Sequence, residues 1–134
     1  MATLMKERLN AITEAIIGAA LAVHTELGPG LLESAYDSCL AFELMDHGYA
    51  IERQKGLPIV YRGRTLDCGY RLDLLVEGCV VVEVKTVERF DRVHTAQVIS
   101  YLRLTGCKVG LLLNFHVRWF VRDGVRRVVN DFPD

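Results

Sequence analysis

Apolar side chains in the first 47 residues recur at the three- and four-residue spacing of amphipathic helices. Within residues 3–26 they are Leu4, Ile12, Ala15, Ile16, Ala19, Ala20 and Val23. Gly28-Pro29-Gly30 interrupts this pattern, because glycine and proline break helices. Helical spacing resumes over residues 31–47, with His47-Gly48 as the expected end. The pattern therefore predicts two helices before any strand.

The rest of the chain favours strands with one helix among them. Short apolar runs predict strands at 57–61, 66–76, 79–85 and 109–115, and a last hairpin pairs 117–122 with 125–129 around Asp123-Gly124. Residues 90–105 return to helical spacing and end at Gly106. The predicted order is α-α-β-β-β-α-β-β, with a helical crossover inside the sheet. We therefore predict an α/β fold whose mixed sheet is flanked by helices.

The central predicted hairpin joins residues 66–76 to residues 79–85. Alternate side chains of a strand share a face, and the apolar faces of the two strands must meet on one side of the sheet. This requirement pairs Leu72 with Val84, Leu74 with Val82 and Val76 with Val80. The connection Glu77-Gly78-Cys79 then has odd length, with Gly78 in a left-handed or bulge conformation.

The same register sets Asp73 opposite Glu83, with Lys85 on the same face. Directly opposed residues have Cβ atoms about 4.5–5.5 Å apart, so the two carboxylates would repel each other. A divalent cation such as Mg²⁺ removes this conflict and can orient a phosphodiester and activate water. Lys85 could then stabilise the transition state. A solvated charged face is the alternative interpretation of these residues.

Length and composition indicate one globular domain over residues 1–134, with 51% hydrophobic and 25% charged residues. No apolar run approaches the roughly 20 residues of a membrane span, and the N-terminus does not resemble a secretory signal. The four cysteines form no C-x-x-C pair, so we interpret them as reduced thiols. We therefore expect a cytoplasmic protein without a membrane partner.

Charge is unevenly distributed although the net charge is only −1. Residues 89–127 hold 8 basic and 2 acidic side chains, whereas residues 1–88 hold 8 basic and 13 acidic ones. The basic part of the chain could meet phosphates. An ordinary solvated surface explains the same charges equally well.

Gly30-Leu-Leu-Glu33-Ser-Ala-Tyr36 follows the first helix and reads G-x-x-E-x-x-Y. Together with the acidic hairpin, this segment resembles the GxxExxY protein family, a branch of the PD-(D/E)xK nuclease superfamily, over residues 16–121. The resemblance implies a restriction-endonuclease-like core of order α-β-β-β-α-β, here with an additional N-terminal helix and a C-terminal hairpin. The proline that precedes the aspartate in the superfamily motif is replaced by Leu72.

By this resemblance, Asp73, Glu83 and Glu33 would be ligands of Mg²⁺ or Mn²⁺, and Lys85 would be the catalytic lysine. Gln97 and Tyr101 form a Q-x-x-x-Y pattern similar to that of RecB-like exonucleases. Four residues apart, they would share a helix face and could orient Lys85 or contact DNA. Tyr36 is a further candidate for binding or orienting the substrate, and packing is its alternative role.

These residues predict a metal-dependent nuclease that hydrolyses phosphodiester bonds, with DNA as the expected partner. One alternative is a catalytically silent nuclease-fold domain that binds protein or nucleic acid. Another is a hydrolase of a different phosphate ester, such as a nucleotide. A homodimer is an assembly that would supply two sites or a larger DNA surface.

Overall fold

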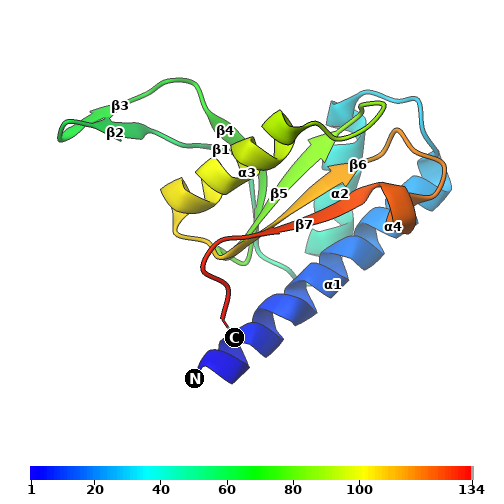
Figure 1. Ribbon diagram of the computed structural model, residues 1–134. Helices are drawn as coiled ribbons and strands as arrows, with labels where there is room; N and C mark the ends of the chain where they lie inside the picture. Colours follow the sequence, from blue (N-terminus) through cyan, green and yellow to red (C-terminus); the bar gives the residue numbers. More distant parts are fainter. Residues whose placement is uncertain (134) are drawn as a thin grey trace.

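The computed structural model describes residues 1–133 and has a five-stranded mixed sheet with helices on both faces (Figure 1). The helices are α1 (Ala2–Leu27), α2 (Glu33–Asp46), α3 (Arg92–Thr105) and the short α4 (Phe120–Asp123). The sheet contains β1 (Ile51–Gly56), β4 (Arg71–Val76), β5 (Val80–Lys85), β6 (Val109–Asn114) and β7 (Val125–Val129). A separate ribbon of β2 (Ile59–Tyr61) and β3 (Arg64–Leu66) projects from the body.

The strand order in the sheet is β1-β4-β5-β6-β7, and β5 and β6 are the parallel pair among otherwise antiparallel neighbours. Parallel neighbours need a long crossover connection, and α3 supplies it. In this pair Lys85 lies beside Asn114, at the carboxyl end of each strand. The ends of β5 and β6 therefore share one edge of the sheet.

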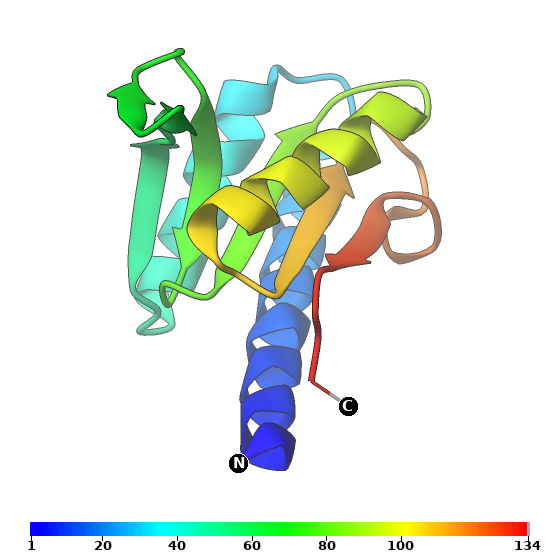
Figure 2. The same ribbon diagram turned by 60° about the vertical axis from the view of Figure 1, so that its left-hand side comes forward.

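Two apolar clusters hold the layers together, one on each face of the sheet, where helices cover it (Figure 2). Val80, Val82 and Val84 of β5 pack in the cluster that α1 and α2 cover. Val81 packs instead with Val98 and Leu102 of α3. Because side chains alternate along a strand, the remaining odd-numbered positions of β5, which carry the candidate site, lie on the α3 side.

The α3 helix lies unusually close to β6 at Gly110. A Cβ atom at this position would come within 2.8 Å of Val98 Cγ1 and 3.2 Å of the Val81 carbonyl oxygen. The absence of a side chain therefore allows α3 to rest directly on the middle of the sheet.

The first strand, β1, was not predicted, because its sequence IERQKG lacks apolar alternation. It is an edge strand with largely exposed side chains, and its pairing with β4 holds it in place. Only residues 71–76 of the predicted strand 66–76 form a strand, β4, and Leu66 is the last residue of β3. A turn separates them, in which Asp67 Oδ1 accepts a hydrogen bond from Gly69 N–H at 3.0 Å.

The prediction of a C-terminal hairpin is wrong in its first strand. Residues 117–122 contain the short helix α4 instead, and β7 pairs antiparallel with β6. Phe120 explains the difference, because its ring is buried 4.9 Å from that of Phe115 and 5.2 Å from that of His24. Burying this ring under α1 outweighs the local preference for a hairpin.

Candidate active site

The predicted register of the central hairpin is confirmed for two of its three apolar pairs, whereas the predicted pairings of Leu72 with Val84 and of Asp73 with Glu83 lie beyond the end of the ladder. Leu74 pairs with Val82, and Val76 pairs with Val80. The turn between them closes through a hydrogen bond from Cys79 N–H to the Val76 carbonyl at 3.0 Å. Glu77 and Gly78 both have positive φ, 54° and 67°, so the glycine is used as the sequence predicted.

Asp73 lies where β4 begins to leave β5, one residue beyond the last pair of the ladder. Its Oδ2 accepts a hydrogen bond from Val84 N–H at 2.7 Å. The side chain thus takes the position of a backbone acceptor and is fixed against the strand that carries Glu83. The predicted proximity of the two acidic residues is present in the structure.

Glu83 is the buried member of the pair, with 4% of its surface exposed. Burial raises its pKa from 4.5 to about 9; the neighbouring Asp73 carboxylate adds to the rise, and the charge of Lys85 opposes it. Its Oε1 is buried without a hydrogen-bond partner among the described residues. An ionised Glu83 therefore needs a cation, because a buried charge without a counter-charge is strongly unfavourable.

Lys85 is the last residue of β5, half-buried and two residues from Glu83. The alternation of the strand puts both side chains on the α3 face, and the ammonium charge is close enough to act on the pKa of Glu83. A carboxylate pair and a lysine therefore lie together at the carboxyl end of the strand.

Glu33 reaches the same end of β5 from the first turn of α2. Its Oε2 accepts a hydrogen bond from Thr86 N–H at 3.2 Å, directly after Lys85. However, residues 1–133 contain no group of three or more His, Cys, Asp or Glu side chains placed to hold one ion. Glu33 is thus beside the site, and the structure does not gather it with Asp73 and Glu83 into one ligand set.

Tyr36 is completely buried. Its hydroxyl donates to the Gly28 carbonyl at 2.5 Å and accepts from Leu31 N–H at 3.1 Å, and its ring stacks on Phe115 at 4.5 Å. Direct substrate binding by Tyr36 does not agree with this burial. The side chain orients the glycine-rich loop from which Glu33 and α2 start.

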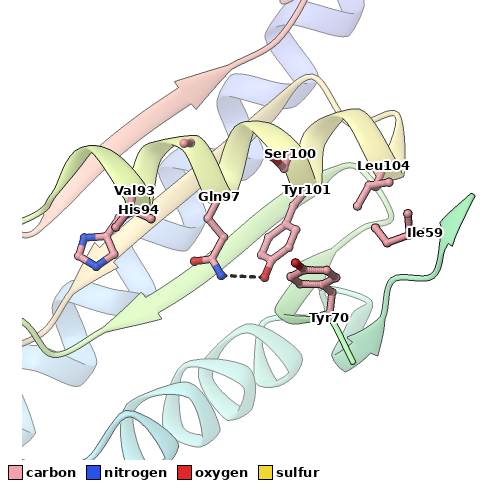
Figure 3. Close-up of a pocket in the computed structure, with 9 residues that line it drawn as sticks. Ile59, Tyr70, Val93, His94, Gln97, Ser100, Tyr101 and Leu104 are labelled. Carbon is pink, nitrogen blue, oxygen red and sulfur yellow. Dashed lines mark hydrogen bonds between the residues drawn. The ribbon is translucent and has the colours of Figure 1, made fainter. Parts of the chain in front are cut away.

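Gln97 and Tyr101 share one face of α3, as their spacing predicted, and Gln97 Nε2 donates to the Tyr101 hydroxyl at 2.9 Å (Figure 3). Burial raises the pKa of Tyr101, and the nearby charges of Glu83 and Asp73 contribute to the same rise. The Gln97–Tyr101 pair therefore forms a wall next to the carboxylates.

Asn114 is a site residue that the sequence reasoning missed. Only 1% of its surface is exposed. Its Oδ1 accepts a hydrogen bond from Val87 N–H at 3.1 Å, and its Nδ2 donates to the Val87 carbonyl at 2.7 Å. It fixes the segment that leaves Lys85. The available signal was a polar residue near the end of the apolar run 109–115.

The donor set fits a hard divalent cation. Asp73 and Glu83 present carboxylate oxygens, of which Glu83 Oε1 is buried and has no described hydrogen-bond partner. Mg²⁺ is commonly bound by one or two carboxylates, with water completing its octahedral shell. Two carboxylates are therefore a sufficient protein contribution, and a bound ion would neutralise the buried charge.

No helix within residues 1–133 combines the length and apolar character needed to cross a membrane. A comparison with curated proteins found no match, and neither did one with solved structures. A family model described as the PD-(D/E)XK nuclease superfamily matches residues 10–128. Proteins of this superfamily generally use divalent metals, and the mixed sheet flanked by helices agrees with the predicted restriction-endonuclease-like fold. With most of its length matched, the chain belongs to the PD-(D/E)XK nuclease superfamily.

Proposed function

We propose that this protein is a metal-dependent nuclease that hydrolyses phosphodiester bonds in DNA. The observation that carries the proposal is Glu83 Oε1, buried beside Asp73 without a hydrogen-bond partner among the described residues, with Lys85 on the same face at the end of β5. Superfamily membership supports it, since a nuclease fold and this combination of residue types point to the same chemistry.

Asp73 and Glu83 would hold Mg²⁺ or Mn²⁺. When bound, such an ion supplies Lewis-acid stabilisation of phosphoryl oxygens and a water of lowered pKa. The Val84 N–H holds Asp73 in place for this role. The role of Lys85 is to place a positive charge against the negative charge that develops on the phosphate.

Glu33 is proposed to support the same site from α2. Its Oε2 is engaged with Thr86 N–H, so Oε1 is the oxygen that remains for the ion or its hydration shell. This arrangement also suggests why the segment Gly30–Tyr36 has its spacing: Tyr36 pins the loop, and Glu33 begins the helix. We therefore propose the GxxExxY branch as the subgroup of this chain.

The decisive experiment incubates labelled single- and double-stranded DNA with the protein and Mn²⁺ or Mg²⁺. We expect cleavage that EDTA abolishes and that Lys85→Ala reduces about 100-fold or more. Lys108→Ala is the matched control, because Lys108 precedes β6 at the opposite edge of the sheet and pairs with Asp131. Undiminished cleavage by Lys85→Ala would reject the proposed mechanism.

A catalytically silent domain that binds protein or nucleic acid is the second candidate. The favouring observation is that Glu83, with a pKa of about 9, can be neutral and stable at physiological pH without a cation. This candidate predicts no cleavage and no effect of Mg²⁺ or Mn²⁺ on the melting temperature.

Sedimentation of the same preparation would test the expected homodimer, and microscopy of a tagged protein would test the cytoplasmic location.

A further inference from the structure

A recess lies beside the carboxylate pair, between α3 and the start of the β2–β3 ribbon (Figure 3). Its volume is about 440 Å³, within the range of about 300–1,000 Å³ of small-molecule sites. The residues that define it here are Ile59, Tyr70, Gln97, Ser100, Tyr101 and Leu104. Neither Asp73 nor Glu83 lines it, and Tyr101 lies next to both the recess and the carboxylates.

The lining combines aromatic faces with hydrogen-bonding groups. Tyr70 is 47% exposed and meets the ring of Tyr101 edge-on, with 6.4 Å between ring centroids. Gln97 uses one N–H on Tyr101, so its carbonyl and second N–H remain for a ligand. Flat apolar surface with a few polar groups is the chemistry that a nucleobase requires.

Positive charge lies on the ribbon and at the start of the strand that follows it. The ribbon carries Arg62 and Arg64, both exposed, and exposed Arg71 follows Tyr70 directly. Arg62 and Gly63 form the turn of the ribbon and both have positive φ. Phosphates on either side of a base in the recess could therefore meet guanidinium groups.

We propose that this recess receives one unpaired base of a single-stranded nucleic acid, which holds a neighbouring phosphate against the carboxylate pair. The inference rests on the proposed nuclease function and specifies the form of its substrate. A duplex would first have to unstack and unpair a base, which costs free energy. A single strand has no such cost because its bases are already unpaired, so it is the preferred ligand.

The test measures binding without cleavage, by fluorescence anisotropy of labelled 12-nucleotide DNA in EDTA at fixed salt. We expect the single strand to bind more tightly than its duplex and than a strand with abasic sites, which keeps the phosphates but lacks bases. Tyr70→Ala should weaken binding about 5- to 150-fold. Ser100→Leu, an exposed helix position that would fill the recess, should do the same.

Two variants control for general effects. Tyr70→Phe keeps the stacking face and should retain binding. Phe42→Ala removes an exposed aromatic ring from α2, on the opposite face of the sheet, and should bind as the parent does. Circular dichroism of each variant confirms that it is folded.

Three results would overturn the base-binding proposal: equal affinity for single strand and abasic strand, unchanged affinity in both Tyr70→Ala and Ser100→Leu, or no measurable binding by the parent. Equal affinity for a mononucleotide would reject the strand in favour of a free nucleotide. Failure of the nuclease proposal is separately visible, since it is the absence of Mn²⁺-dependent cleavage by the wild type while base-dependent binding persists.

Discussion

Glu83 links the stability of the protein to the state of its candidate active site. Its carboxyl group is buried without a described partner on Oε1, and its pKa is far above the value of a free glutamate. A proton or a metal ion can neutralise it, and these two ligands compete for the same oxygen atoms. The pH should therefore affect folding and metal binding in opposite directions.

In metal-free solution the folded protein should lose stability as the pH rises from about 4.5 toward 9. Over this window the unfolded chain releases the proton of Glu83 while the folded chain retains it, so each pH unit lowers the free energy of unfolding by about 1 kcal/mol. Glu83→Gln should lack this contribution. Urea titrations in EDTA at several pH values measure it, and a difference between wild type and Glu83→Gln that does not change with pH would contradict the expectation.

Asn114 offers a second test at the residue level. Asn114→Ala would leave the part-buried backbone groups of Val87 without the side chain that they bond, which costs about 1–3 kcal/mol. Because these bonds fix the segment after Lys85, nuclease activity should fall as well. Asn10→Ala, whose side chain bonds the exposed Arg127, is the control and should change stability by less than about 0.5 kcal/mol.

Among the elements, α3 depends on one position in its neighbour. Gly110→Val should push the helix away from β6, because even a Cβ atom would collide with Val98 and with the Val81 carbonyl. We expect a loss of about 1–3 kcal/mol in stability and weaker DNA binding, since Gln97 and Tyr101 move with the helix. Gly18→Ala is the matched control in α1, where a Cβ has open space, and it should stabilise the helix slightly. Equal stability of Gly110→Val and wild type in chemical denaturation would refute this packing argument.

The elements that the sequence predicted well are those whose own side chains determine their burial. The apolar alternation of β4 and β5 gave both the register and the adjacency of Asp73 and Glu83. By contrast, β1 is polar and exists because β4 offers it a pairing edge, a non-local cause that no local pattern contains. The short helix α4 depends on the burial of the Phe120 ring against those of Phe115 and His24, and His24 is distant in sequence. Likewise, Glu33 could be expected near the strand, but its partner Thr86 could not.

For the molecule as a whole, Mg²⁺ or Mn²⁺ should act as a folding ligand. An ion that binds only the folded state stabilises it by about 1.4 kcal/mol at ten times its Kd, which corresponds to a rise of a few degrees in melting temperature. The rise should be larger at pH 8 than at pH 6, because protons compete for Glu83. Differential scanning fluorimetry measures this, with Asp73→Asn expected to remove the shift and Asp46→Asn, at the far end of α2, to keep it. An identical shift in Asp73→Asn would place the ion elsewhere.

The parallel pairing of β5 with β6 has a consequence for how such a protein can evolve. Both strands end at one edge, and the segments that leave them carry exposed residues outside the ladder and outside both apolar clusters, namely Glu88, Arg89, His116 and Arg118. Exchanges at these exposed positions would reshape the surroundings of Lys85 while leaving the two cores intact. New substrate preferences can therefore arise by changes in loops alone, without a new requirement on folding.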